Sequence, residues 1–163
     1  MDIIIISAVA KNNVIGKDGD IPWRIKEDFL HFKELTIGSP CIMGKNTYES
    51  LPVKPLPKRE NIVLTRNPNY KAEGVIIMNS FESALKYCEE KGFEKVFIIG
   101  GSSIYKQGLE FANVLELTHL KQEFEGDTYF PEVNYDEWNL ISKEEHEHEK
   151  YGKYSFCRYE KKQ

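Results

Sequence analysis

The feature of this sequence that most constrains its fold is a series of short, unbroken apolar runs separated by helical segments. The runs are rich in Ile and Val, and they read IIIISAV (3–9), CIM (41–43), NIVL (61–64), GVIIM (74–78) and KVFII (95–99). Unbroken apolar runs of this length are typical of strands that are buried on both faces, as in a parallel sheet covered by helices on both sides. The sequence therefore predicts an α/β fold.

Helices are predicted in the intervals between these runs. IKEDFLHFKEL (25–35) has apolar residues at helical spacing. We expect these residues to form one side that faces the core: Ile25, Phe29, Phe32 and Leu35. GKNTYESL and SSIYKQGLEFA each begin a helix directly after an apolar run. SFESALKYCEEKG (80–92) is predicted as a helix with Ser80 as its N-cap and Gly92 at its end.

The pattern changes after residue 113. NVLELTHLKQEF, WNLISKEEH and YSFCRYEKK alternate apolar and polar residues with no helix between them, as antiparallel strands do. The chain has no internal repeat, no low-complexity tract and no linker. We therefore expect one domain over residues 1–163, with an antiparallel addition at its C-terminal end.

Composition narrows the function classes. Twenty-two Lys and Arg against 26 Asp and Glu give a net charge of −4 without a basic run, so no nucleic-acid partner is expected. Cys41, Cys88 and Cys157 show no metal-ligand spacing, which favours reduced thiols in a cytoplasmic protein. The apolar N-terminus is shorter than the roughly 20 residues that span a bilayer, so no membrane partner is expected either.

Three strand ends carry groups suited to phosphate. Gly44-Lys45-Asn46-Thr47 and Gly100-Gly101-Ser102-Ser103 each lead from a strand into a helix, and Thr65-Arg66 follows a third strand. Ligands of open α/β sheets bind beyond the carboxyl ends of the strands, and helix N-termini offer unpaired N–H groups to phosphate. Two such ends suit a dinucleotide. The added cations Lys45 and Arg66 favour NADP over NAD, because a 2′-phosphate would explain them.

Each of these motifs also has a plainer interpretation. The sequence contains neither GxGxxG nor GxxxxGK[ST], and a strand–Gly–Gly–helix connection is often only a tight turn. His146 and His148, in EEHEHEK, resemble metal ligands, but they alternate with glutamates as an exposed face or a hairpin end does. We predict no metal.

Asp28 is the most unusual single residue. It lies three residues after Ile25 and four before Phe32, on the apolar side of the predicted helix. Acidic residues are common in first helical turns, where they interact with the helix dipole, and a solvated Asp28 would mean nothing more. A partly desolvated carboxylate would instead have a raised pKa and could recognise a ligand with two adjacent N–H donors, or help to deliver a proton.

Taken together, these residues resemble a known family. VIGKDGDIPWRIKEDFLHFKELT, IMGKNTYESL, PLPKRENIVLTR, VFIIGGSSIY, LTHL and EGDTYFP occur in this order. The chain resembles the bacterial dihydrofolate reductases over nearly its whole length. The resemblance implies a mixed, mostly parallel eight-stranded sheet flanked by helices on both faces, with an antiparallel C-terminal strand hairpin. It also implies a cis peptide between Gly100 and Gly101.

The resemblance also implies roles for individual residues. Asp28 is expected to bind the 2-amino group and N3 of the pterin and to support protonation of N5, through water rather than directly. Thr118 is expected to orient that carboxylate, and Trp23 to lie behind the pterin; these three form the expected catalytic set. Arg59 is expected to clamp the α-carboxylate of the substrate's glutamate with two hydrogen bonds.

Further residues are expected at the two ligands. The substrate-binding set is Ile6, Ala8, Asp28, Phe29, Phe32, Lys33, Leu51, Leu56, Arg59, Ile99 and Thr118. The set expected to bind NADPH is Ala8, Ile15, Gly16, Ile21, Gly44, Lys45, Asn46, Thr47, Thr65, Arg66, Ile99, Gly100, Gly101, Ser102, Ser103, Ile104, Tyr105 and Thr128. The mobile loop 10–24, with Asn13 and Asp20, is expected to close over the nicotinamide, and Gly126-Asp127 to steady it.

The implied activity is the reduction of 7,8-dihydrofolate to 5,6,7,8-tetrahydrofolate by NADPH, with hydride transfer to C6 and protonation of N5. It would support one-carbon metabolism and the synthesis of thymidylate, purines and amino acids. The expected partners are dihydrofolate and antifolate-like small molecules, and a monomer is expected. One alternative is a related NADPH reductase acting on a riboflavin-pathway pyrimidine, and another is a non-catalytic nucleotide- or folate-binding protein.

Overall fold

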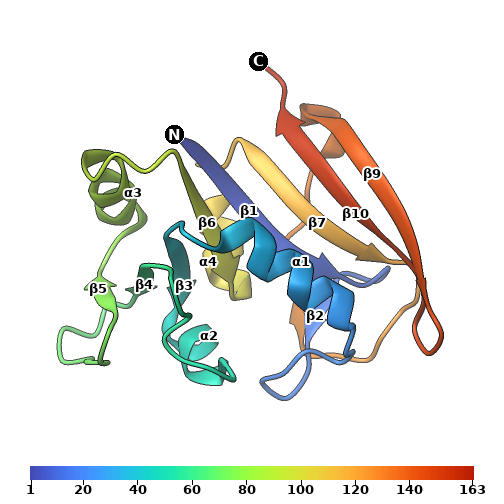
Figure 1. The fold of residues 1–163 in the computed structure, drawn as a ribbon, viewed down its shortest axis with the longest axis horizontal. Helices are drawn as coiled ribbons and strands as arrows, with labels where there is room; N and C mark the ends of the chain where they lie inside the picture. The colour runs from blue at the N-terminus through green and yellow to red at the C-terminus, as the bar shows by residue number, and fades with distance from the viewer.

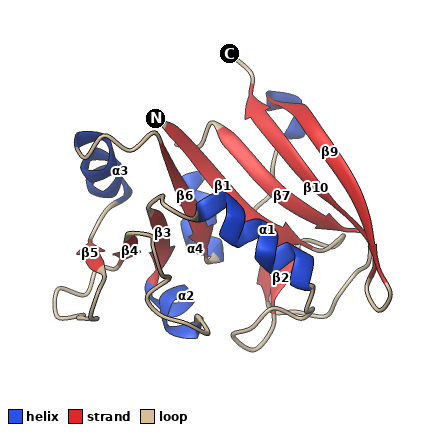
Figure 2. Cartoon of the chain, in the orientation of Figure 1, coloured by secondary structure: helices blue, strands red, loops and turns tan.

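The computed structural model describes all 163 residues. Its centre is an eight-stranded sheet in the order β5-β4-β3-β6-β1-β7-β10-β9 (Figures 1 and 2). The strands are β1 (Asp2–Val9), β3 (Cys41–Gly44), β4 (Asn61–Leu64), β5 (Ile76–Met78), β6 (Lys95–Gly100), β7 (Val114–Leu120), β9 (Trp138–His148) and β10 (Gly152–Lys161). The predicted fold class is confirmed, since the five pairings from β5 to β7 are parallel and those of β10 are antiparallel.

Helices cover both faces of this sheet, as the apolar runs predict. They are α1 (Lys26–Thr36), α2 (Lys45–Ser50), α3 (Phe81–Glu90) and α4 (Ser102–Gly108). Successive residues of β1 point to opposite faces. Ile5 packs in one core with residues of α3 and α4, whereas Ile4 and Ile6 pack in the other core with residues of α1 and α2. Both faces of the strand are therefore buried.

Local signals set the ends of α3. Ser80 is the N-cap, and its hydroxyl accepts a hydrogen bond from the Ser83 N–H at 3.1 Å, which satisfies one of the first-turn donors. Gly92 follows the helix with φ +79°, a conformation in which a Cβ is disfavoured. Both features agree with the sequence prediction.

The prediction for α1 was only partly right. Ile25 is fully buried, but it is the N-cap and lies outside the helix. Phe29 is 46% exposed, while Phe32 and Leu35 are half-buried. The apolar side of α1 is thus covered by the core only in its C-terminal half.

Three short elements were not predicted. β2 (Val14–Gly16) and β8 (Thr128–Tyr129) pair antiparallel in a separate two-stranded sheet, and η1 (Tyr135–Glu137) is a single 3-10 turn. Runs of two or three residues are too short to show a periodicity. The three cysteines are buried and unpaired, and no helix is long and apolar enough to cross a membrane.

Candidate active site

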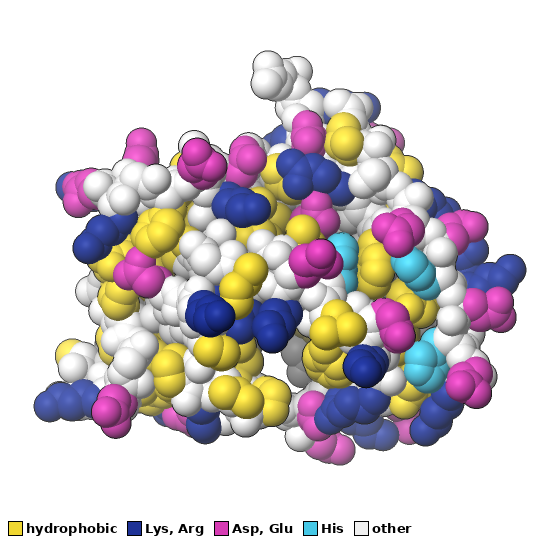
Figure 3. Space-filling view, viewed as in Figure 1, with side chains coloured by type: hydrophobic (Ala, Val, Ile, Leu, Met, Phe, Trp, Pro, Cys, Tyr) yellow, Lys and Arg dark blue, Asp and Glu magenta, His cyan; other side chains and the backbone are white.

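The candidate active site is a hollow bordered by α1, β1, β6 and the segment after α2. In Figure 3 this face is hollowed below α1, with hydrophobic side chains at the rim. Apolar side chains from all four elements belong to the same packed cluster: Ile6, Phe32, Leu51, Leu56 and Ile99. Ile6 is 5% exposed and the other four are half-buried. The expected substrate-binding residues from distant parts of the sequence thus come together.

Asp28 lies beside this apolar cluster, on the first turn of α1. One oxygen, Oδ1, accepts a hydrogen bond of 2.7 Å from the Thr118 hydroxyl on β7, and the other oxygen has no partner within the chain. Burial raises the pKa of Asp28 above its usual value, and the Thr118 hydrogen bond opposes this rise. The site therefore holds a desolvated carboxylate with acceptor capacity left for a ligand.

Trp23 and Ala8 belong to a third packed cluster, and Ala8 lies opposite Thr118 in the pairing of β1 with β7. Trp23 is 1% exposed, and its ring centroid lies 4.9 Å from that of Phe124. Ala8 is half-buried and packs against the cluster that contains Trp23 and Ile25. Phe29, by contrast, joins none of the packed clusters, so its ring is free to contact a ligand. Lys33 is exposed in the last turn of α1.

Arg59 lies in the segment between α2 and β4. Its Nε donates a hydrogen bond of 2.9 Å to the carbonyl of Pro57, and the side chain is half-buried. The backbone of this segment is held by the buried Asn61, whose side-chain amide donates to the carbonyls of Leu56 and Arg59 and accepts from the Leu56 N–H. The guanidinium is therefore carried by a segment whose backbone is fixed by hydrogen bonds to Asn61.

The two glycine-bearing strand ends lie against each other. Gly44 is the N-cap of α2 and Gly101 the N-cap of α4, and neither helix has a side-chain cap. A Cβ at Gly101 would lie 3.4 Å from the Thr47 hydroxyl, and one at Gly44 would lie 3.1 Å from Ile104 Cγ1. Two uncapped helix N-termini therefore lie together, with their first N–H groups open to an anion.

Polar and cationic side chains surround these N-termini. Lys45 and Asn46 are exposed at the start of α2, and Arg66 is exposed after β4; Thr65 and Ser102 are half-buried. The Lys45 ammonium lies 5.5 Å from the centre of the Tyr70 ring. Ser103 is exposed, and its hydroxyl accepts from Gln107 within α4. This donor set fits a dinucleotide that carries several phosphates.

Tyr105 differs from the other residues expected to bind the cofactor, because its side chain is committed inside the protein. It is 5% exposed, and its hydroxyl lies 2.8 Å from the carbonyl of Ile6 and 2.9 Å from that of Ile99. Burial raises the pKa of this phenol. Its ring also packs beside Gly100, where φ is +119°. Tyr105 thus ties β1 to β6 at the site, and the Gly100-Gly101 peptide is cis, as the resemblance implies.

The segment 10–24 is held against residues 126–130. The Asp127 N–H donates to the Gly16 carbonyl at 3.0 Å, and an oxygen of the Asp127 carboxylate accepts from the Asp18 N–H at 3.0 Å. The hydrogen bond from the Asp18 N–H and a further one from the Thr128 hydroxyl lower the pKa of the Asp127 carboxylate. The Phe130 N–H donates to the Asn13 carbonyl. Ile15 packs on the core, whereas Ile21 is 36% exposed.

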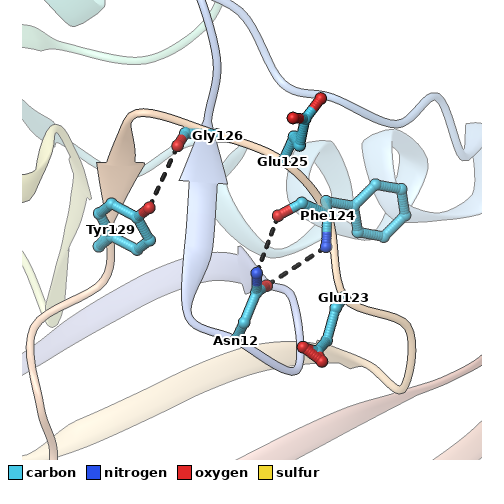
Figure 4. A pocket seen from close by; sticks show the side chains of 6 residues that line it. All are labelled: Asn12, Glu123, Phe124, Glu125, Gly126 and Tyr129. Carbon is cyan, nitrogen blue, oxygen red and sulfur yellow. Dashed lines mark hydrogen bonds between the residues drawn. The ribbon is translucent and has the colours of Figure 1, made fainter.

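The contact between Asn12 and Phe124 is not predicted from the sequence. Asn12 uses both ends of its side-chain amide on the backbone of Phe124, donating to its carbonyl at 2.8 Å and accepting from its N–H at 3.3 Å. Figure 4 shows this pair at the edge of an open hollow of about 430 Å³ that Tyr129 also lines. Its lining includes neither Asp28 nor any residue of the apolar cluster described beside it. Neither residue has a sequence signal, because the contact joins segments more than a hundred positions apart.

The histidines are engaged in packing and local contacts. In Figure 3 the histidine side chains visible on this face lie near acidic side chains, toward the side of the β9–β10 hairpin. The His31 ring stacks on Phe156 with a centroid separation of 3.9 Å, and His146 Nε2 lies 2.9 Å from a carboxylate oxygen of Glu144. No group of three or more His, Cys, Asp or Glu side chains is arranged to hold a metal ion.

Comparison with known proteins bears on this arrangement. A family model described as dihydrofolate reductase matches residues 2–161. The dihydrofolate reductase of Haemophilus influenzae is 42% identical over 159 residues, which cover 98% of this chain and 96% of that protein. That of Bacillus subtilis is 39% identical over 98% of this chain and 95% of its own. A solved dihydrofolate reductase from Enterococcus faecalis, complexed with NADP(H) and RAB-propyl, is similar with a TM-score of 0.90 and 35% identity, over 99% of this chain and 97% of that one.

Proposed function

The chain belongs to the dihydrofolate reductase family, and on that premise we propose that it reduces 7,8-dihydrofolate to 5,6,7,8-tetrahydrofolate with NADPH. The hydride goes to C6 and a proton to N5. The observation that carries this proposal is the Asp28 carboxylate, desolvated and hydrogen-bonded by Thr118 beside an apolar hollow. An activity of this kind supports one-carbon metabolism and the synthesis of thymidylate, purines and amino acids.

Asp28 recognises the pterin in this proposal. The 2-amino group and N3 of the pterin present two adjacent N–H donors, and a carboxylate offers two oxygens at a matching separation. Thr118 occupies one lone pair of Oδ1 and so fixes the plane of the carboxylate. Because the group is desolvated, each hydrogen bond it makes to the ligand is stronger than the same bond in water.

The rest of the substrate lies along the apolar hollow. Phe29, Phe32, Leu51 and Ile99 offer flat or branched apolar surface to the pterin and p-aminobenzoyl rings. Arg59 then meets the glutamate α-carboxylate. Aromatic stacking at one end and a charged clamp at the other together orient the substrate. Orientation of this kind can lower the activation free energy of a reaction by about 7 kcal/mol or more.

The cofactor would be held by the two uncapped helix N-termini. Backbone N–H groups after Gly44 and Gly101, with the hydroxyls of Thr47 and Ser102, would bind the pyrophosphate, while Lys45 and Arg66 would attract a 2′-phosphate. This charge arrangement favours NADPH over NADH. NADPH, when bound, supplies the hydride.

Proton delivery and exclusion of water fall to Asp28, Trp23 and the segment 10–24. The raised pKa of Asp28 keeps proton exchange at this carboxylate accessible closer to neutral pH than for a solvated aspartate. The buried Trp23 forms an apolar wall, and the segment 10–24, held by Asp127, covers the reacting rings. The proton reaches N5 through water that Asp28 polarises.

The alternatives make different demands on the site. A riboflavin-pathway pyrimidine has no glutamate tail and gives Arg59 no role. A non-catalytic binding protein would need no desolvated carboxylate at the reacting rings. Asp28 and Arg59 together therefore favour dihydrofolate as substrate.

The test is NADPH oxidation, followed at 340 nm with and without dihydrofolate, and repeated with NADH at equal concentration. We expect oxidation that requires dihydrofolate and is strongly reduced with NADH. Asp28→Asn is expected to lose most turnover at neutral pH while keeping NADPH affinity. Glu27→Gln is the matched control, because Glu27 is an exposed carboxylate on the same helical turn. Equal turnover of the Asp28→Asn and Glu27→Gln enzymes would contradict the proposal.

We further propose that residues 1–163 act as one domain, monomeric and cytoplasmic, with small-molecule ligands and neither nucleic-acid nor membrane partners. The first strand, β1, lies between β6 and β7 near the middle of the sheet, which supports a single folding unit. Three buried, unpaired thiols suit a reducing compartment. Size-exclusion chromatography with light scattering tests the monomer.

A further inference from the structure

Arg59 is held by contacts inside the chain at two separate nitrogen atoms. Nε donates to the carbonyl of Pro57, and Nη1 donates to the Thr36 hydroxyl, both at 2.9 Å. A guanidinium has five N–H donors, so these two bonds leave about three of them for a ligand. The two bonds thereby fix the direction of the side chain and leave N–H donors available to a ligand.

Thr36 is the last residue of α1 and is fully buried, at 0% exposed. Its hydroxyl donates to the carbonyl of Phe32 at 2.8 Å. A hydroxyl has a single proton, so this bond orients the oxygen lone pairs, and one of them accepts from Arg59. Bonding to the residue four positions back is common for helical threonine and has a local role only. The bond to Arg59 spans 23 residues and has no such local explanation.

The backbone beneath Arg59 is fixed without Thr36. Asn61 binds the carbonyls of Leu56 and Arg59, and the Gly38 N–H donates to the carbonyl of Lys58 at 3.0 Å. These bonds tie the segment to β4 and to the end of α1. They do not hold the guanidinium itself, which is held at Nε by the Pro57 carbonyl and at Nη1 by the Thr36 hydroxyl. Without the Thr36 hydroxyl, the outer nitrogens could turn about the single remaining bond at Nε.

We propose that Thr36 is a positioning residue that aims the Arg59 guanidinium at the glutamate α-carboxylate and so sets the preference for substrates that carry this tail. The proposal rests on the function proposed above for Arg59. Loss of the hydroxyl lets the guanidinium sample several directions, and the carboxylate must then restrict it on binding. The loss therefore weakens binding of the tail without touching the chemistry at the pterin.

The test compares dihydrofolate with dihydropteroate, which has the same rings and lacks the glutamate. Thr36→Val has nearly the same shape and no hydroxyl. We expect it to raise KM for dihydrofolate about tenfold, the size expected for one hydrogen bond to a charged group, with kcat changed less than twofold. KM for dihydropteroate is expected to stay the same. Thr36→Ser, which keeps the hydroxyl, is expected to restore most of the affinity for dihydrofolate.

A purely structural role of Thr36 predicts a different pattern. It would lower the melting temperature and raise both KM values together, or change neither, and each of these results would overturn the proposal. If Thr36→Val does not fold, Thr36→Ala provides the same loss of the hydroxyl without branched bulk and is judged by the same comparison of substrates.

Arg59→Met separates failure of this inference from failure of the proposed function. If Arg59→Met leaves KM for dihydrofolate unchanged, the role of Arg59 itself is wrong. If Arg59→Met raises that KM and Thr36→Val does not, only the positioning role of Thr36 is wrong. In the Arg59→Met background, Thr36→Val is expected to have no further effect on KM, because the group that it positions is gone.

Discussion

Replacement of Gly126 by alanine should separate closure of the segment 10–24 from the chemistry. Gly126 has no positive φ, so alanine is compatible with the backbone at this position. Its Cβ, however, would lie 2.4 Å from Val14 Cγ1 and 2.6 Å from the Gly16 carbonyl oxygen. Both atoms belong to β2, the strand that ties the segment 10–24 to β8. The obstacle at Gly16 is backbone, which a rotamer change cannot relieve.

The size of the effect follows from these distances. Relief of the clash requires the Gly16 oxygen to move from 2.6 Å to about 3.4 Å, where ordinary contact begins. That oxygen also accepts the 3.0 Å bond from the Asp127 N–H, which a shift of this size would weaken or break. Overpacking of this kind costs about 1–3 kcal/mol. A middle value of ~2 kcal/mol shifts the equilibrium away from the closed arrangement about thirtyfold.

The assay is a single turnover with enzyme in excess, in which NADPH absorbance is followed by stopped flow. We expect the hydride-transfer rate of Gly126→Ala to fall tenfold or more, because the reacting rings are covered for a smaller fraction of the time. Gly108→Ala is the control: its Cβ would lie 2.8 Å from Ile98 Cδ1, so it overpacks where α4 meets β6 and makes no contact with β2. If hydride transfer in Gly126→Ala stays within twofold of the unchanged protein, the reasoning is refuted.

Three further predictions concern charge. Burial raises the pKa of Asp28 above its unfolded value, so the ionised carboxylate lowers the stability of the folded protein at neutral pH. Asp28→Asn should therefore raise the melting temperature at pH 7, and the gain should disappear in acid, where Asp28 is protonated. A lower melting temperature at pH 7 would contradict this prediction. Lys45→Gln and Arg66→Gln should each raise KM for NADPH about tenfold at low salt, because both exposed cations attract the extra phosphate of this cofactor. KM for NADH, which lacks that phosphate, should stay unchanged. An equal rise in both KM values would refute this role. Burial lowers the pKa of His31, which stacks on Phe156, so the protein loses stability as the pH falls below the ordinary histidine value of about 6.5. The melting temperature of His31→Gln should therefore depend less on pH between 7.5 and 5.5. The same pH dependence in both proteins would count against this reasoning.

Much of the fold was predictable because its signals are local. The unbroken run before Ala10 and the run over 61–64 become strands with nearly the predicted ends, since only a doubly buried strand tolerates such composition. Ser80 and Gly92 mark the ends of α3 through bonds and dihedral angles that involve neighbouring residues alone. Asp28 stood out for the same reason, as a charge among apolar residues at one helical spacing.

Only the tertiary structure decided which part of the molecule lies against each side of a helix or strand. The spacing of Phe29 is that of a core residue, yet its ring is 46% exposed because no element covers that end of α1. The β2–β8 pairing, the bond from the Tyr105 hydroxyl to the Ile6 carbonyl, and the bond from Arg59 to Thr36 all join segments that are separate in the chain. A sequence pattern records the period of a segment and the polarity of its sides, because these depend on its own residues. It does not record which distant segment comes to rest against a side, and the direction of a functional group depends on that contact.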